Sequence, residues 1–155
     1  MSELSQLAQL CTFTVDDLYL GVDVTEVQEV IRYQAMTVVP LAPPVVRGLI
    51  NLRGHIVTTL DLRSMLGLPE ASSDELPVNV VIRDGADEAV SLLVDQIGDV
   101  VDVDEIAFED VPPTLTGPAR ELVLGAYKLP GRLLLVLDTR KVQDVHLRGL
   151  AAASA

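Results

Sequence analysis

The strongest constraint on the fold of this chain is a sequence pattern that occurs twice. The segment from Gly48 to Arg63 aligns with the segment from Gly125 to Arg140 at a constant offset of 77 residues, and six of the sixteen aligned positions are identical. The identical pairs are Gly48/Gly125, Leu52/Leu129, Gly54/Gly131, Leu60/Leu137, Asp61/Asp138 and Arg63/Arg140. Chance would give about one identity, so the similarity indicates repeated structure. Shared positions report what the fold requires, and unshared positions are free to serve function.

The repeat predicts a mainly β protein with two similar small subdomains, not a single α/β sheet. The match extends upstream to Leu20–Asp23 and Leu92–Asp95, so each copy reads as strand, Val-Asp, connector, strand, glycine turn and strand. The predicted boundaries are residues 10–70 with the C-terminal segment for the first subdomain, 77–138 for the second, 71–76 for a polar linker, and 1–9 and 149–155 for flexible ends.

Turn residues and alternating apolar residues predict three hairpins. Asp61 and Asp138 each precede a short apolar segment and are predicted to cap a helix, because a carboxylate there accepts hydrogen bonds from free backbone N–H groups. The hairpins are predicted at Gly48–Leu60, turning at Arg53-Gly54; at Val78–Arg83 and Ala89–Val94, turning at Asp84-Gly85; and at Leu122–Leu129 and Arg132–Leu137, turning at Pro130-Gly131.

Composition narrows the class of protein. Hydrophobic residues make up 49% of the chain, but it contains only three Tyr, two Phe and no Trp, so the core must be aliphatic. Val and Ile favour strands, which agrees with the β prediction. No apolar run is long enough to span a bilayer, and the N-terminus lacks a signal-peptide pattern. The single cysteine, Cys11, excludes an internal disulfide and suits a reducing cytoplasm.

The net charge of −12 is unevenly distributed. Ten acidic residues and no Lys or Arg lie between Asp84 and Ala119. Binding to a nucleic-acid backbone needs clustered cations, so this composition argues against it. The acidic stretch is either a solvated face that aids solubility or a docking surface for a basic partner.

The sequence gives little support to an enzyme. It has no glycine-rich phosphate loop, no His-Glu-X-X-His, no Gly-X-Ser-X-Gly and no cysteine pair. The two histidines, His55 and His146, are far apart, and Cys11 on an apolar strand reads as a core residue. Asp102 and Asp104 would share a strand face and offer oxygens to Ca²⁺ or Mg²⁺. Their neighbourhood lacks the spacing of a calcium loop, so solvation is the preferred interpretation.

Arg53 is the informative difference between the two copies. The second copy has Pro130 at this position, so the turn does not itself require Arg. A planar guanidinium at a hairpin tip suits recognition of a carboxylate on a partner, and an ordinary solvated turn residue is the alternative. Glu29 is a possible partner within the chain, although an exposed pair adds only about 0–1 kcal/mol.

Several of these segments together resemble the CheW family of bacterial chemotaxis coupling proteins. The resemblance covers Leu10 to Val145 and is carried by Leu20–Asp23, Val27–Val30, Gly48–Gly54 and Leu60–Arg63. It implies two SH3-like five-stranded β-barrel subdomains with short helices, without catalytic activity, metal or cofactor. It also implies a cytoplasmic adaptor, recruited to membrane receptor arrays, that joins the cytoplasmic tips of methyl-accepting chemoreceptors to the regulatory domain of the histidine kinase CheA.

The resemblance also implies a partner-binding site near the groove between the subdomains. Gly48 matches a family glycine where bulk is poorly tolerated, and Val80 and Val90 fall on the facing edge of the second subdomain. The predicted residues are Val27, Glu29, Val30, Gly48, Asn51, Arg53, Val80 and Val90. Thr58 and Ser91 depart from the family, in which many members have Pro and Gly at these positions, and they affect local strand detail.

Two other functions stay open at this point. The first is an isolated kinase-regulatory or receiver-linked module of the same fold, although such modules are normally fused to other domains. The second is a small carboxylate-dependent or metal-dependent enzyme, which an ordered metal on Asp102 and Asp104 would support.

Overall fold

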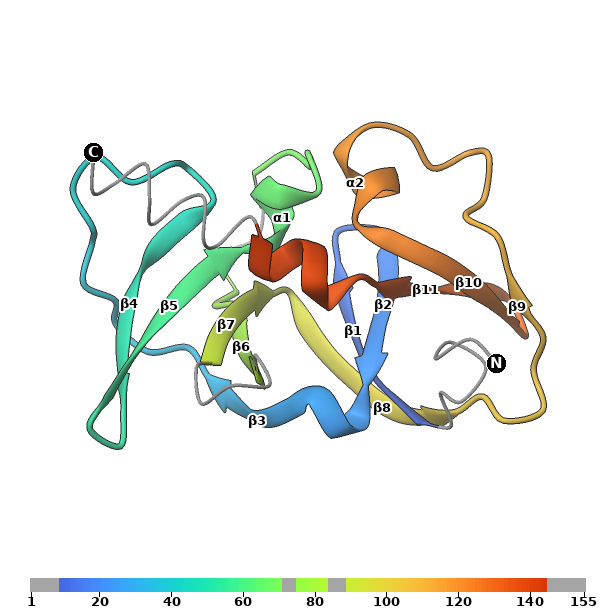
Figure 1. The fold of residues 1–155 in the computed structure, drawn as a ribbon, viewed down its shortest axis with the longest axis horizontal. Helices are drawn as coiled ribbons and strands as arrows, with labels where there is room; N and C mark the ends of the chain where they lie inside the picture. The colour runs from blue at the N-terminus through green and yellow to red at the C-terminus, as the bar shows by residue number, and fades with distance from the viewer. Residues whose placement is uncertain (1–8, 71–74, 84–88, 145–155) are drawn as a thin grey trace.

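The computed structural model describes residues 9–70, 75–83 and 89–144, and within them the strands form two sheets (Figure 1). Sheet A has the order β8-β1-β2-β11-β10-β9 and sheet B the order β3-β6-β7-β5-β4. Sheet A contains β1 (Gln9–Val15), β2 (Leu18–Asp23), β8 (Gln96–Asp102), β9 (Phe108–Glu109), β10 (Val123–Leu129) and β11 (Arg132–Leu137). Sheet B contains β3 (Val27–Arg32), β4 (Val46–Leu52), β5 (His55–Asp61), β6 (Val78–Arg83) and β7 (Ala89–Val94). The mainly β, two-unit fold is confirmed.

Each sheet takes strands from both copies of the repeat. The β6–β7 hairpin of the second copy lies between β3 and β5 in sheet B, and the β1–β2 hairpin of the first copy lies between β8 and β11 in sheet A. Val30 therefore pairs with Val80, and Leu10 pairs with Val101. The predicted division into residues 10–70 and 77–138 is wrong about which strands belong to each sheet. Similarity between the copies does not reveal which copy supplies the neighbour of a given strand.

The core has three parts, and the central one joins the two sheets. Successive residues of one strand enter different clusters, as the alternation of strand side chains requires. Leu135 belongs to the central cluster and Leu134 to a cluster that sheet A supplies; Val80 belongs to the central cluster and Val81 to a cluster of sheet B residues. Both sheets are thus buried on two faces, which explains the high aliphatic content.

The repeated glycines allow strand crossings that a side chain would block. Both Gly48 and Gly125 lie at an irregularity in their hairpin register. A Cβ on Gly48 would lie 2.7 Å from the Thr37 carbonyl oxygen, and one on Gly125 would clash with the Glu109 backbone and the Phe108 ring. Thr37 pairs with Leu49 as Glu109 pairs with Ala126, so the two copies share this crossing.

The short helices follow the predicted caps. The α1 helix (Leu62–Met65) starts at Asp61, whose Oδ1 accepts a hydrogen bond from Ser64 N at 3.3 Å. Residues 139–144 are also helical, and Asp138 Oδ1 accepts from Lys141 N at 3.2 Å. Both capping predictions are confirmed. The 3-10 helix η2 (Val24–Glu26) and the α2 helix (Pro118–Glu121) complete the described elements.

The last helical residues connect the two sheets, and Figure 1 shows this red helix between them. Val142 is fully buried in the central cluster. Lys141 Nζ donates to the Glu121 carbonyl of α2 at 3.1 Å, and Gln143 Nε2 donates to the Arg83 carbonyl of β6 at 3.0 Å. This segment therefore helps to fix how the sheets sit against each other.

Some predictions concern residues outside the described part of the chain. These are the flexible ends, apart from Gln9, which begins β1, most of the 71–76 linker, the Asp84-Gly85 turn and His146. No helix among the described residues is long and apolar enough to cross a membrane.

Candidate partner-binding site

The tip of the β4–β5 hairpin is a two-residue turn formed by Arg53 and Gly54. Leu52 pairs with His55 across it, and the φ angles of Arg53 and Gly54 are 52° and 84°. Positive φ at both central residues is typical of a type I′ turn, which favours Asn, Asp or Gly at the first position. Arg53 in this left-handed conformation costs about 1–2 kcal/mol. The Asn51 side chain offsets part of this cost, because its Oδ1 accepts a hydrogen bond from Gly54 N at 2.9 Å.

The equivalent turn of the second copy differs in backbone conformation. Gly131 has a φ of 79°, but the ring of Pro130 restricts that residue to negative φ. Pro130 is therefore not a like-for-like replacement for Arg53. The conclusion that the first turn does not require Arg still holds, because a type I′ turn is easier to form with Asn or Gly.

Arg53 forms a bidentate ion pair with Glu29 of β3. Nη1 lies 2.9 Å from Glu29 Oε1, and Nη2 lies 2.7 Å from Glu29 Oε2. The strands β3 and β4 are opposite edges of sheet B, so this contact shows that the sheet curls until its edges meet. The Arg53 side chain is 72% exposed and that of Glu29 is 18% exposed. Two of the five guanidinium N–H donors serve the pair, and the pair does not use the other three.

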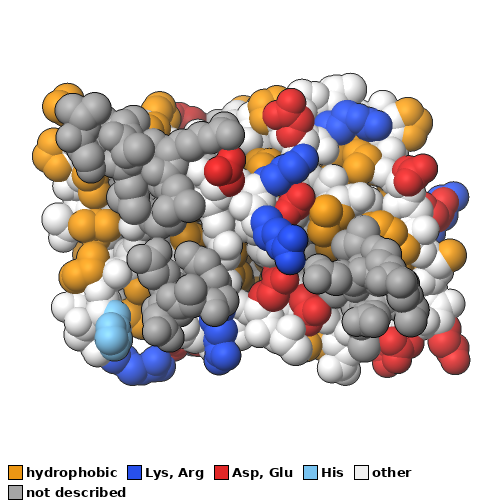
Figure 2. All heavy atoms as spheres, viewed as in Figure 1, with side chains coloured by type: hydrophobic (Ala, Val, Ile, Leu, Met, Phe, Trp, Pro, Cys, Tyr) orange, Lys and Arg blue, Asp and Glu red, His pale blue; other side chains and the backbone are white. Residues whose placement is uncertain are grey.

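Two exposed apolar residues lie on the strands that carry or adjoin this ion pair. Val30 follows Glu29 on the edge strand β3 and is exposed. Ile56 lies on β5, directly across from Asn51, and is 65% exposed. Figure 2 shows cationic and His side chains where Figure 1 places this hairpin tip. Sequence reasoning missed Ile56, although it aligns with Leu133 of the second copy, which is also exposed.

Three of the predicted site residues cannot offer a free side chain to a partner, and a fourth is half-buried. Val80 and Val90 are 0% and 2% exposed and belong to the central core. Gly48 is buried against Thr37, and Val27 is half-buried against the same core. The prediction of direct contact is therefore wrong for Val80, Val90 and Gly48. Both valines also lie in the same sheet as Val30, not on a facing subdomain edge.

Strand β8, an edge of sheet A, also exposes apolar side chains, which were not predicted from the sequence. Ile97 and Val100 pair with Phe13 and Cys11, and both are exposed. A register shift brings these two side chains, three residues apart, to the same face. The Thr12 hydroxyl stabilises the shift by donating to the Asp99 carbonyl at 2.5 Å. The surrounding acidic residues were predicted to be either a solvated face or a docking surface, and both interpretations stay predictions.

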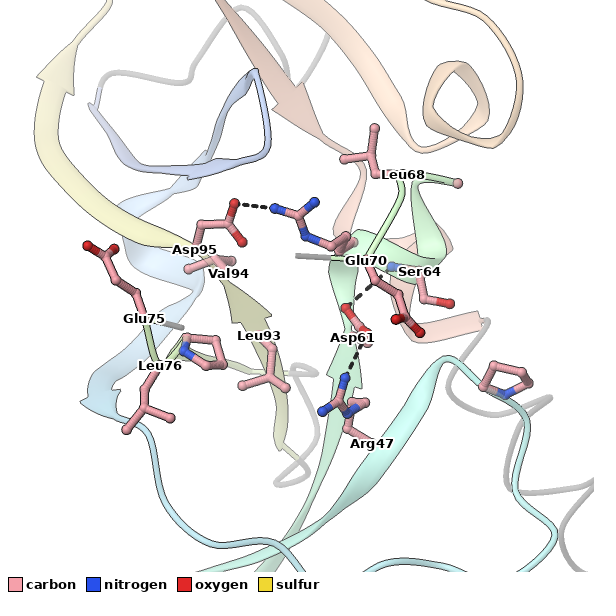
Figure 3. A pocket seen from close by; sticks show the side chains of 14 residues that line it. Arg47, Asp61, Ser64, Leu68, Glu70, Glu75, Leu76, Leu93, Val94 and Asp95 are labelled. Carbon is pink, nitrogen blue, oxygen red and sulfur yellow. Dashed lines mark hydrogen bonds and ion pairs between the residues drawn. The ribbon is translucent and has the colours of Figure 1, made fainter. Parts of the chain in front are cut away.

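A cavity of about 790 Å³ opens beside α1 and the end of β7 (Figure 3). Its arginines are matched by carboxylates: Arg47 lies 3.2 Å from Asp61, and Arg63 lies 2.5 Å from Asp95. Arg63 also donates to the Pro69 carbonyl and lies 3.4 Å from Asp16, so it joins α1 to the β1–β2 turn of sheet A. This arrangement is a structural clamp between the sheets.

The residues considered for catalysis have structural environments. Cys11 is buried in the central core, and burial raises the pKa of its thiol, which disfavours the nucleophilic thiolate. Asp102 Oδ1 accepts a hydrogen bond from Asp104 N at 3.0 Å. Across residues 9–70, 75–83 and 89–144, no three His, Cys, Asp or Glu side chains are grouped as a metal ion would need.

These features define a small two-sheet β protein with an exposed hairpin tip, where Glu29 holds the Arg53 guanidinium in one orientation. The chain belongs to the CheW family: residues 9–145 match the CheW-like domain. It is 31% identical to the chemotaxis protein CheW of Bacillus subtilis over 92% of this chain and 91% of that protein. It is likewise 31% identical to CheW of Treponema pallidum, with 86% and 81% covered. The crystal structure of the scaffolding protein TtCheW from Thermoanaerobacter tengcongensis matches with a TM-score of 0.74 and 25% identity, covering 84% and 88% of the chains.

Proposed function

We propose that this chain is a non-catalytic cytoplasmic adaptor that couples the cytoplasmic tips of chemoreceptors to the regulatory domain of the histidine kinase CheA. The observation that carries the proposal is the Arg53 guanidinium, which is held in one orientation by Glu29 and yet is 72% exposed. The relatives are chemotaxis proteins, and one solved relative is a scaffolding protein, which supports the same role.

The physical reason to assign Arg53 to a partner is that folding gains little from it. An ion pair whose arginine is 72% exposed contributes on the order of 1 kcal/mol, which the cost of the left-handed backbone at this residue offsets. A fixed guanidinium, in contrast, offers a partner carboxylate a donor whose orientation is already set. We assign this contact to the receptor tip, and we assign the exposed Val30 of β3 to the same partner.

An adaptor of this kind changes kinase output by holding two proteins in register. Each contact can be weak, because engagement of one partner raises the effective concentration of the other. The two exposed regions described above, the β4–β5 tip of sheet B and the β8 edge of sheet A, allow more than one protein to bind the same molecule.

Binding of the full chain to a receptor cytoplasmic tip and to the CheA regulatory domain tests the proposal by calorimetry. Arg53→Asp is expected to weaken receptor binding by about tenfold or more, the equivalent of a charged hydrogen bond. The fold should survive, because the Arg53 side chain lies at a hairpin tip and is 72% exposed. Arg132→Asp is the matched control, since Arg132 begins β11 at the other hairpin tip and lies over the Tyr19 ring. Unchanged receptor binding by Arg53→Asp, or its unfolding, would contradict the assignment.

A further inference from the structure

Strand β8 is a long edge of sheet A that the fold leaves open. Among the described residues it pairs only with β1, so no described strand occupies its other side. Six of its seven residues are exposed. The other sheet edges are short or closed, because β9 has two residues and the β3 and β4 edges meet through the Arg53–Glu29 pair. The free backbone N–H and C=O groups of an open edge are a template on which another extended chain can add as a strand.

This edge also carries apolar side chains. Ile97 and Val100 are 41% and 53% exposed, and they lie on the face of sheet A that their pairing partners Phe13 and Cys11 share. Phe13 and Cys11 are buried in the central cluster, so the two exposed side chains extend the apolar face of the sheet to its edge. Val101 packs against the cluster that sheet A supplies, which holds β8 in place. A strand added beside β8 would therefore gain both backbone hydrogen bonds and apolar contacts.

The charges of the edge indicate which kind of strand fits it. Asp99 and Asp102 lie on β8, Asp104 and Glu105 follow it directly, and all four are exposed. None of the four forms an ion pair with a Lys or Arg in the part of the chain that the structure describes. An added strand that carries Lys or Arg is complementary to these carboxylates. A second copy of the chain is disfavoured, because pairing β8 with itself would oppose like charges, and each copy has a net charge of −12.

We propose that β8 is a docking edge for an extended, basic segment of a partner protein, which adds to sheet A as a further strand. The backbone pairing supplies affinity, and the carboxylates of Asp99 and Asp102 select a segment with Lys or Arg. The apolar side chains of that segment cover Ile97 and Val100. The inference goes beyond the proposed function, because it concerns the other sheet from the Arg53 tip and defines its occupant by backbone and charge.

The test titrates the full chain with a fluorescent synthetic peptide, Lys-Val-Lys-Val-Lys-Val-Lys, and follows binding by fluorescence polarisation. One control peptide has Glu in place of every Lys, and the other keeps the basic sequence but has every backbone amide methylated, so that it lacks the donors for strand pairing. The basic peptide should bind at least tenfold more tightly than either control. Its binding should slow amide hydrogen exchange in residues 96–102, which make up β8.

Two chain variants with the same charge change locate the contact. Asp99→Lys should weaken binding of the basic peptide by about three- to tenfold, because it replaces an attraction by a repulsion. Its thermal stability should match that of the wild type, since the Asp99 side chain is exposed and unpaired among the described residues. Glu121→Lys is the matched control and should bind like the wild type. Glu121 is exposed and ends α2, which Figure 1 places on the opposite side of the molecule from β8.

Four results would overturn the inference. The basic peptide could fail to bind the wild-type chain at millimolar concentration. Equal binding of the methylated peptide would reduce the contact to charge without strand pairing. An equal loss of affinity in Glu121→Lys, or exchange protection outside β8, would place the peptide elsewhere. Self-association of the chain that Asp99→Lys changes, measured by sedimentation, would make a second copy the occupant. Because the probe contains neither receptor nor kinase, failure of the proposed function in its own assay is distinguishable from each of these results.

Discussion

Replacement of Gly48 by Ala separates a structural role of this glycine from a direct contact with a partner. The new Cβ would lie 2.7 Å from the Thr37 carbonyl oxygen and 2.9 Å from Met36 Cβ. Thr37 cannot move away easily, because it is tied to Leu49 by two backbone hydrogen bonds. Forcing an extra methyl group into such a contact costs about 1–3 kcal/mol. For a chain of this size, a loss of 2 kcal/mol lowers the melting temperature by roughly 4–8 °C.

The measurement combines urea unfolding with receptor-tip binding, so that affinity is expressed per folded molecule. Gly48→Ala should lower the unfolding free energy and leave the affinity of the folded fraction close to that of the wild type. Gly125→Ala should be destabilised in the same way, because its Cβ would clash with the Glu109 backbone. A tenfold loss of affinity in a variant that unfolds like the wild type would refute the assignment of Gly48 to the fold.

Three further predictions concern the core, the clamp and a half-buried acid. Val80→Ala should lower the unfolding free energy by about 2 kcal/mol without changing receptor binding, because Val80 is buried. Val30→Ser should weaken receptor binding without changing the unfolding free energy, because Val30 is exposed. Equal behaviour of the two variants in both assays would contradict this distinction. Arg63→Ala should lower the unfolding free energy, measured in urea, by about 2–3 kcal/mol, because it leaves Asp95 without its cation. An unchanged urea midpoint of unfolding would exclude the clamp. Burial raises the pKa of Glu26 above its ordinary value of 4.5, so protonated Glu26 favours the folded state, and this contribution to stability is lost as the pH rises from 4.5 through the raised pKa. At pH 7, Glu26→Gln should therefore melt at a higher temperature than the wild type. The difference in melting temperature should shrink as the pH falls below 4.5.

The sequence predicted the elements of the fold better than their assembly. Turn glycines, strand alternation and the two capping aspartates act locally, so the hairpins at Gly48–Leu60 and Leu122–Leu137 and both helix starts could be read directly. The pairing of β3 with β6 depends on contacts between residues about fifty positions apart. Local pattern carries no information about which of two similar copies supplies that neighbour, and the strand division was therefore mispredicted.

The candidate site was predicted in part for a similar reason. Glu29 and Arg53 were paired correctly because charge and turn chemistry are visible in the sequence. Val80 and Val90 were placed on a surface because a valine on a strand looks the same whether it faces the core or a partner. Ile56, Ile97 and Val100 were missed because exposure of an aliphatic residue follows from sheet curvature and register shifts, which only coordinates reveal.

The crossed arrangement of the hairpins has a consequence for biosynthesis. In sheet B the β6–β7 hairpin fills the space between β3 and β5, and in sheet A the β1–β2 hairpin does the same between β8 and β11. During synthesis, strands β3, β4 and β5 therefore lack their neighbours in sheet B until the chain has been made beyond position 94. Neither copy of the repeat can complete a sheet alone, so we expect the chain to fold as a single cooperative unit. A break between residues 71 and 76 would then yield two fragments that need each other to fold.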